Sequence, residues 1–325
     1  MPFTTAIVGL EQVGSSIGLA LKRTGAELRI IGHDRNPEVA KRSSKAGCVD
    51  QTEWNLINAC EGADLIVIAT APGEIETTLN AIGQYLKPGC VVTDTAGVKT
   101  PVLAWASQAL PPTVHFVGGH PIPARRTGRL GDADGLPDAD EPSAELFDGG
   151  VYCLTPGTAT PPDALRVVSD LAQAVGAEPY FLDASEHDGL IAAVEGVPLL
   201  LAAALQATAS KSPSLREVLR LSGTPFAAAT QLLASSSSDL ADLLALNAEN
   251  NARWTQTFVA ELSTLRDLAL GGDSDSLQAY ISDALDAHAN WIPRKVDAET
   301  VDYSDFGMTS MMFGDTFKPR RRKDG

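Results

Sequence analysis

The first half of the chain alternates short apolar runs with segments of helical length. The runs are rich in β-branched residues, and five of them are strand candidates: Thr5–Val8, Leu28–Ile31, Leu65–Ala69, Val91–Thr93 and His115–Val117. Parallel strands need a crossover segment between them, usually a helix, so this alternation predicts successive strand–helix–strand units. We therefore expect an α/β fold with a doubly wound parallel sheet.

The turn after the first of these runs carries a pattern typical of nucleotide binding. Glycines lie where the strand turns into a helix, so backbone N–H groups and the helix N-terminus can hold a pyrophosphate. The predicted contacts in this turn are Gly9, Leu10, Gln12, Val13 and Gly14. The sequence therefore predicts a Rossmann-type domain that binds a dinucleotide.

The residues after the second predicted strand indicate which dinucleotide is bound. Asp34 follows Gly14 by twenty residues, where a carboxylate accepts hydrogen bonds from ribose hydroxyls and repels a 2′-phosphate. NAD is thus the expected cofactor. Arg35 could still hold a 2′-phosphate, which leaves NADP as the alternative, and Thr70 and Ala71 follow the third run, where the cofactor passes in such folds.

Glu11 departs from the G-x-G-x-x-G pattern, because it stands at the middle glycine. A carboxylate that points toward the pyrophosphate would repel it, whereas one that points outward from a permitted backbone conformation would leave binding possible. The sequence is compatible with both orientations of the Glu11 side chain.

The pattern changes after Ser185 to long helical segments. These segments are Glu186–Ala209, Ser214–Leu221, Asp239–Leu270 and Ser274–Ile292. The longest of these predicted helices would offer an extended packing surface, which favours a homodimer. We predict a Rossmann-type domain over residues 1–184, an all-helical domain for substrate binding and dimerisation over residues 185–292, and an extended or disordered tail over residues 293–325.

The composition narrows the class of partner. Asp and Glu number 41 against 25 Lys and Arg, and the net charge of -16 disfavours nucleic acid and anionic membranes. A small-molecule substrate fits better. The longest apolar run, Val197–Ala204, has about eight residues, whereas a membrane-spanning helix needs ~20. The N-terminus lacks the features of a signal peptide, and the four cysteines lack metal-site spacing, so we expect a cytoplasmic protein without a metal site.

Six stretches resemble the prephenate dehydrogenase family, which contains the prephenate and arogenate dehydrogenases of tyrosine biosynthesis. In chain order they are IVGLEQVGSSIGLALKRTG, GHDRNPE, VVTDTAGVK, FVGGHPI, LFDGGVYCLTP and SEHDGLIAAVEGVP. They are spread over roughly residues 5–270, in the family's order. The resemblance implies a divergent member that carries out NAD(P)-dependent oxidative decarboxylation of prephenate or arogenate.

The same resemblance implies a catalytic base. The histidine of the family's G-G-H-P stretch corresponds to His120. An imidazole suits the chemistry, because removal of the C4 hydroxyl proton, as hydride leaves C4, lets the ring carboxylate depart as carbon dioxide. In contrast, His187 and Asp188 match the family's E-H-D stretch, and we do not expect them to be catalytic.

The departures from the family lie at the substrate pocket. Gly97 stands where the family commonly has a serine that hydrogen-bonds the substrate hydroxyl, and the helical stretch FAAATQLL lacks the family's arginine. Arg125 and Arg126 could bind the substrate carboxylates instead, or could be solvated surface residues. Two further functions remain open: a dehydrogenase of another hydroxylated acid, and a non-catalytic dimeric binding or regulatory protein.

Overall fold

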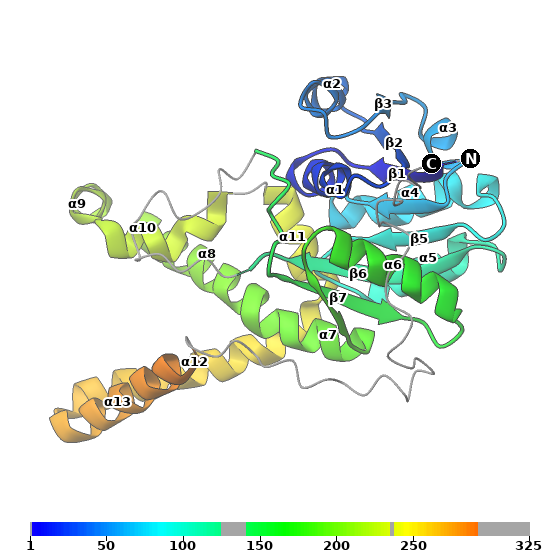
Figure 1. The fold of residues 1–325 in the computed structure, drawn as a ribbon. Coiled ribbons are helices and arrows are strands. Elements are labelled where there is room, and N and C mark those ends of the chain that lie inside the picture. Colours follow the sequence, from blue (N-terminus) through cyan, green and yellow to red (C-terminus); the bar gives the residue numbers. More distant parts are fainter. Residues whose placement is uncertain (1, 125–140, 235–236, 292–325) are drawn as a thin grey trace. The chain divides into compact units, whose positions relative to one another are not determined.

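The computed structural model describes residues 2–124, 141–234 and 237–291, and its centre is an eight-stranded sheet (Figure 1). The strands are β1 (Phe3–Val8), β2 (Leu28–His33), β3 (Gln51–Thr52), β4 (Leu65–Ile68), β5 (Val91–Asp94), β6 (His115–Ile122), β7 (Val151–Pro156) and β8 (Glu178–Phe181). Their order in the sheet is β3-β2-β1-β4-β5-β6-β7-β8. The first six strands have the order of a Rossmann fold, which confirms the predicted fold class.

The last two strands run opposite to the first six. β7 runs antiparallel to β6, with His120 opposite Cys153, whereas β8 runs parallel to β7. The central strands are buried on both faces, as expected for a sheet covered by helices on its two sides, and all four residues of β4 have an exposed fraction of 0%.

Helices lie between most of the strands that are successive in the sequence. In the nucleotide-binding part they are α1 (Gln12–Arg23), α2 (Pro37–Lys45), α3 (Leu56–Cys60), the 3-10 turn η1 (Pro72–Glu74), α4 (Ile75–Ile82), α5 (Thr100–Ala109) and α6 (Pro162–Ala174). Proline occupies one of the first two positions of α2, α5 and α6, where its missing N–H costs no helical hydrogen bond.

The first long segment after the sheet is a helical run with one irregular turn. It comprises α7 (Ala184–Ile191), a π-helical turn (Ala192–Gly196) and α8 (Val197–Ser210). Pro198 cannot donate a backbone hydrogen bond to the preceding turn, and the widened turn before it accommodates this loss. By length and composition alone, the run Ala184–Ser210 would be sufficient to cross a membrane.

The remaining described helices are α9 (Leu215–Leu221), α10 (Thr224–Thr230), α11 (Ser237–Leu246), α12 (Ala248–Gly271) and α13 (Ser274–Trp291). The single helix predicted over Asp239–Leu270 is therefore wrong: α11 and α12 are separated at Asn247, a buried residue whose side-chain amide donates a hydrogen bond to the carbonyl of Asp188. The chain divides into two compact units, and the second starts at Glu249. In the second unit, the Tyr280 hydroxyl on α13 contacts the Glu261 carboxylate on α12.

The carboxyl ends of the parallel strands place the candidate residues at one edge of the sheet. Gly9 follows β1, Asp34 follows β2, Thr70 follows β4 and Asp94 ends β5. Ligands of open α/β sheets bind outside this edge, so a ligand site is expected there.

Candidate functional site

The turn between β1 and α1 can be formed only with glycines at two positions. Gly9 has a φ of 92°, and a Cβ atom there would lie 2.5 Å from the carbonyl oxygen of Ala69. A Cβ on Gly14 would lie 1.9 Å from the carbonyl oxygen of Gly9. The backbone of this turn is thus held close to β4, and the first N–H groups of α1, from Gln12 and Val13 onward, face the strand ends.

Asp34 holds the same turn from the end of β2. Its carboxylate accepts hydrogen bonds from the backbone N–H of Leu10 at 2.8 Å and of Asn36 at 2.8 Å. A carboxylate has about four acceptor positions, so two remain for ribose hydroxyls. Among the described residues, the buried Thr70 hydroxyl at the end of β4 has no hydrogen-bond partner. An anionic acceptor and a buried unsatisfied hydroxyl beside a glycine turn fit a bound dinucleotide.

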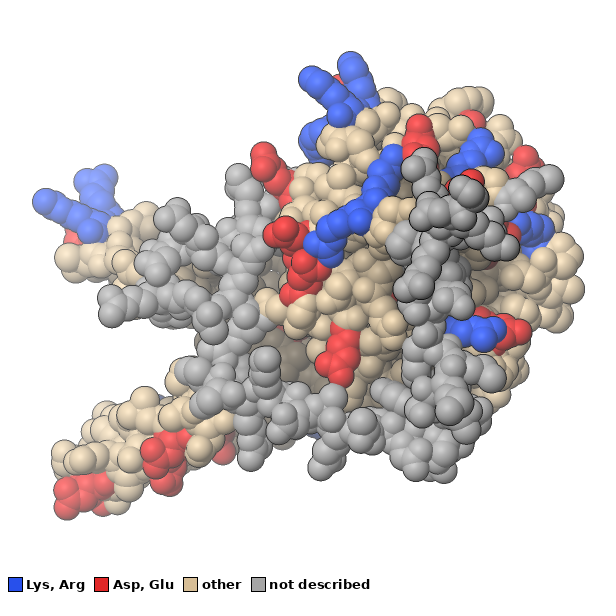
Figure 2. Space-filling model, viewed as in Figure 1, with Lys and Arg blue, Asp and Glu red and all other residues tan. Residues whose placement is uncertain are grey.

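The residues around Asp34 also affect whether the 2′-phosphate of NADP could be bound. Arg35, the residue that could bind this phosphate, forms an ion pair with Glu74 in η1. A cavity of about 730 Å³ borders Asp34, Arg35, Lys41 and Trp54 and does not include His120. Lysine and arginine side chains gather over α2 beside it, at the top of the view in Figure 2. The Asp34 carboxylate would repel a 2′-phosphate, so NAD remains favoured over NADP.

Glu11 does not distort the turn. It precedes α1 with φ −71° and ψ −162°, an extended conformation open to any residue, and its side chain is exposed. The middle position of the pattern therefore needs no glycine for backbone reasons in this chain.

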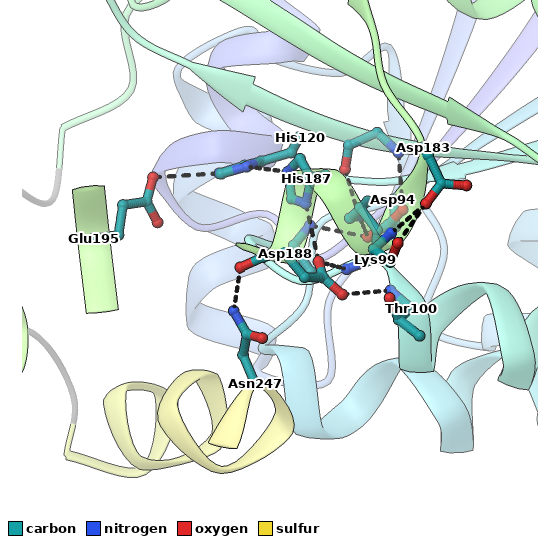
Figure 3. A network of polar contacts seen from close by, with 12 residues as sticks. Asp94, Lys99, Thr100, His120, Asp183, His187, Asp188, Glu195 and Asn247 are labelled. Atoms are coloured by element: carbon teal, nitrogen blue, oxygen red, sulfur yellow. Dashed lines mark hydrogen bonds and ion pairs between the residues drawn. The ribbon is translucent and has the colours of Figure 1, made fainter. Parts of the chain in front are cut away.

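His120 lies on β6 at the centre of a buried polar network (Figure 3). Its exposed fraction is 8%, and its Nδ1 is 3.1 Å from Nε2 of His187 on α7. The two rings meet edge to face, at 78° and a centroid separation of 5.2 Å. On the other side of the ring, His120 Nε2 lies 3.8 Å from a carboxylate oxygen of Glu195.

Asp188 anchors the other end of this chain of contacts. One carboxylate oxygen accepts from His187 Nδ1 at 3.0 Å and from the backbone N–H of Lys99 at 2.7 Å, and the other accepts from the N–H of Thr100 at 2.8 Å. Burial raises the pKa of Asp188, but the hydrogen bonds from His187 and from the start of α5 outweigh it and lower this pKa overall. Asp188 is therefore ionised and can only accept.

These partners assign the tautomers of both histidines. Because the Asp188 carboxylate accepts, His187 carries its proton on Nδ1, and its Nε2 accepts from His120 Nδ1. The lone pair of His120 then lies on Nε2. Burial, with smaller contributions from His187 and Lys99, holds the pKa of His120 well below 6.5, so this nitrogen is unprotonated near neutral pH. An imidazole arranged in this way can act as a general base.

A buried ion pair fixes the strand that carries the base. Lys99 and Asp94 both have an exposed fraction of 0% and are paired through Nζ and a carboxylate oxygen. Lys99 Nζ also donates to the carbonyl of Gly119 at 2.6 Å, and the N–H of Gly119 donates to Asp94 at 3.0 Å. The loop after β5 is thus bonded to the residue directly before His120.

Gly97 lies beside His120. A Cβ atom on Gly97 would lie 3.6 Å from Cε1 of His120 and 3.3 Å from a carboxylate oxygen of Glu195. The structure therefore brings together His120 and Gly97 from the predicted site. Arg125 and Arg126 lie outside the described residues.

Sequence reasoning missed the residues that surround the base. His187, Asp188 and Glu195 were not among the predicted site residues, yet they form a continuous line of contacts through His120. The available signal was a histidine and three acids in a largely apolar helical run, since buried charged groups need partners.

Two domains of known proteins match consecutive parts of the chain. The nucleotide-binding domain of prephenate dehydrogenase matches residues 17–181, and its dimerization domain matches residues 183–283. The prephenate dehydrogenase of Bacillus subtilis is 30% identical over 209 residues, which are 63% of this chain and 53% of that protein. A cyclohexadienyl dehydrogenase of Zymomonas mobilis is 26% identical over 61% of this chain and 64% of that protein.

The chain spans about half the length of the curated relatives from Bacillus subtilis and Lactococcus lactis. Among solved structures, prephenate dehydrogenase of Aquifex aeolicus, in complex with hydroxyphenyl propionate and NAD+, has a TM-score of 0.79 and 22% identity, covering 89% of this chain and 98% of that one. Synechocystis arogenate dehydrogenase has a TM-score of 0.70 and 23% identity, covering 89% of this chain and all of that one. Since the nucleotide-binding domain match alone covers half of the residues, the chain belongs to the prephenate dehydrogenase family.

Proposed function

We propose that this protein catalyses the NAD-dependent oxidative decarboxylation of prephenate or arogenate, with His120 as the general base. The observation that supports this most is the orientation of the base: the His187–Asp188 pair holds Nδ1 of His120, so the basic Nε2 faces Gly97 and Glu195 at the edge of the sheet. The relatives with this activity, and the solved complex of one of them with NAD+, support the same assignment.

In this mechanism the chain positions the cofactor and removes one proton. Gly9, Gly14 and the start of α1 bind the pyrophosphate, Asp34 accepts from the ribose, and Thr70 contacts the cofactor beside β4. Bound NAD supplies the hydride acceptor. His120 Nε2 accepts the proton of the ring hydroxyl as hydride leaves the same carbon, and the ring carboxylate departs as carbon dioxide.

Binding of the substrate carboxylates needs cations. We assign this role to Arg125 and Arg126, since guanidinium groups bind carboxylates bidentately. Gly97, next to His120, would border the ring hydroxyl. Exchange of both arginines for glutamine should raise KM much more than it lowers kcat.

The function is tested by mixing the purified chain with NAD and either prephenate or arogenate and following the reduced cofactor and carbon dioxide. His120→Asn should lower turnover by ~100-fold or more without loss of NAD affinity. The matched control is His115→Asn, at the other end of the same strand, which should leave turnover unchanged. Absence of turnover with both substrates in the wild type would refute the proposal.

A second candidate function is the oxidation of another hydroxylated acid. It is favoured by Gly97 at the position of the family's serine and by the missing arginine in the stretch FAAATQLL. In that case the chain would bind NAD and leave prephenate and arogenate unreacted.

We further propose a homodimer formed through the helical domain that begins at residue 185. The match to a dimerization domain supports it, and so do exposed apolar side chains on the helices of the first unit: Leu190, Val194, Leu201, Leu219, Leu221 and Leu232. Sedimentation should give a dimer mass that Leu221→Glu reduces. Tyr85→Glu, an exposed site outside these helices, should leave the mass unchanged.

The proposed dimer assigns the apolar run Ala184–Ser210 to a second copy of the chain and not to lipid. The same run carries His187, Asp188 and Glu195, which the base requires. All four cysteines are free and buried, in keeping with a cytoplasmic protein. The chain should then be recovered from cells in the membrane-free fraction.

A further inference from the structure

Glu195 is a carboxyl group beside the catalytic base. It lies in the π-helical turn before α8, and its side chain points toward His120 in Figure 3. The separation between His120 Nε2 and the nearer carboxylate oxygen is 3.8 Å, too long for a direct hydrogen bond. The two groups face each other without bonding.

A hydroxyl oxygen that bonds to both groups would lie about 2 Å to one side of the line that joins them. An oxygen placed ~2.8 Å from each of two atoms 3.8 Å apart forms an angle of roughly 85°, which suits a hydroxyl that donates to one side and accepts from the other. The hydroxyl proton would point to His120 Nε2. A hydrogen-bond donor is then required on the other side.

The loop residue that faces this gap offers no donor side chain. Gly97 has only hydrogen on its Cα, and the carboxylate of Glu195 lies 3.3 Å from the position that a Cβ there would occupy. Glu195 therefore fills the space into which a hydroxyl-bearing side chain at residue 97 would extend. Leu243 closes the same space at 3.2 Å and is apolar.

The charges around Glu195 favour its neutral form. His120, whose Nε2 lies 3.8 Å away, is unprotonated, and Cys153 on β7 is a thiol whose pKa burial raises to about 11. The Lys99 ammonium is already paired with Asp94. Among the described residues Glu195 has no cation of its own, and burial raises its pKa to about 7, so the carboxyl carries a proton in a large part of the molecules near neutral pH.

We propose that Glu195, in its protonated form, binds the hydroxyl of the substrate from the side opposite His120 and so replaces the side chain missing at Gly97. This inference rests on the proposed function for the identity of the substrate. No proton leaves Glu195 in the step: the hydroxyl proton moves to His120 Nε2, hydride leaves the same carbon, and the oxygen becomes a carbonyl while it accepts the hydrogen bond. A donor placed at the developing negative charge lowers the barrier.

Binding measurements can test this without turnover. The NAD-loaded protein is titrated by calorimetry with 4-hydroxyphenylpropionate and with phenylpropionate, which differ only in the hydroxyl. The wild type should bind the hydroxyl compound about tenfold more tightly, Glu195→Ala should lose this preference, and Glu195→Gln, whose amide also donates, should keep most of it. The control is Glu186→Gln, an exposed glutamate on α7, which should match the wild type.

The pH dependence and a rescue variant separate a donor from a structural role. Above pH 7 the wild type should lose its preference for the hydroxyl compound as Glu195 ionises, whereas Glu195→Gln should keep it. In the double variant Glu195→Ala with Gly97→Ser, the serine hydroxyl supplies a donor near His120, and the preference should return. Thermal unfolding of each variant shows whether it is folded.

Three results would overturn the inference: no hydroxyl preference in the wild type, an unchanged preference in Glu195→Ala, or equal losses in the Ala and Gln variants. The last result would mean that a carboxylate is required. A wild type that shows the hydroxyl preference but oxidises neither prephenate nor arogenate would refute the proposed function alone.

Discussion

The glycine turn between β1 and α1 and the polar network around His120 use different means to hold their geometry. The turn between β1 and α1 depends on backbone: Gly9 at a φ of 92° and Gly14 against its carbonyl oxygen. The network around His120 depends on side chains, with the buried pair Lys99–Asp94 on one side and His187 on the other. The first needs the absence of Cβ atoms, and the second needs particular charged groups.

This difference explains which departures from the family pattern are tolerated. Glu11 replaces a glycine of the turn, but its φ is negative and its side chain is exposed, so the backbone is undisturbed. Gly97 removes a side chain from the polar network around His120, where geometry does depend on side chains, and there Glu195 occupies the space. In the network, the side chain missing at Gly97 is accompanied by Glu195 in the same space. In the turn, no second change accompanies Glu11.

The largest effect is expected from Lys99→Met. It leaves the Asp94 carboxylate buried without its cation, and we expect the free energy of unfolding to fall by ~3–5 kcal/mol. Urea denaturation measures the loss. The matched control is Lys22→Met, which removes a surface pair with Asp50 and should cost less than ~1 kcal/mol. Equal losses in the two variants would show that the network does not depend on its buried charges.

Gly9→Ala should have the next largest effect and should act on the turn. The methyl group meets the carbonyl of Ala69 at 2.5 Å, and the positive φ adds strain of about 1–3 kcal/mol. NAD affinity, measured by calorimetry, should fall at least about tenfold. Gly25→Ala is the control: its φ is 67°, but no atom lies within 4 Å of the added Cβ, so NAD affinity should not change. If both variants bind NAD normally, the close approach to β4 is unimportant.

The pH dependence of stability should separate two groups of the network with opposite signs. His120 has a folded-state pKa well below 6.5, so below pH 6.5 the unfolded chain takes up a proton that the folded chain does not, and stability falls by up to ~1.4 kcal/mol per pH unit. Glu195 has a folded-state pKa of about 7 against an ordinary 4.5, so the folded chain takes up its proton first and stability rises on acidification. The two effects therefore oppose each other as the pH falls below 6.5 in the wild type.

Substitution of His120 or of Glu195 separates their contributions to the pH dependence of stability. Relative to the wild type, His120→Asn should become more stable as the pH falls from 6.5, and Glu195→Gln should become less stable. In each variant, the slope of the free energy of unfolding against pH should change by the equivalent of up to about one bound proton. Urea denaturation at several pH values measures both slopes. Slopes of the same sign in the two variants would contradict the protonation states assigned to the network.

The fold and the glycine turn could be predicted because both depend on local sequence. Alternating apolar runs gave the strands, and the glycine spacing with Asp34 located the turn, since periodicity and φ requirements act over a few residues. Arg35 directly follows Asp34 in the sequence, but its pairing with Glu74 joins two loops and cannot be seen in the sequence.

The network could not be predicted because its contacts join distant segments. The contact between His120 and His187 spans 67 residues. Lys99, in contrast to the usual solvated lysine near a turn, is fully buried, and only Asp94 five residues earlier gave a local signal. The break of the predicted helix at Asn247 follows from a hydrogen bond to Asp188, 59 residues away. Such contacts are set by tertiary packing and leave no periodicity.

The smallest effect is expected from Glu11→Gly, which restores the glycine pattern of the turn. Because Glu11 already has a negative φ and an exposed side chain, removing it gains no new backbone conformation and removes only a screened surface charge. NAD affinity should therefore change by less than about threefold, and slightly more at low salt than at high salt. Calorimetry at two salt concentrations measures this. A rise of tenfold or more would mean that the carboxylate reaches the pyrophosphate, and the turn would then depend on side-chain charge as the polar network around His120 does.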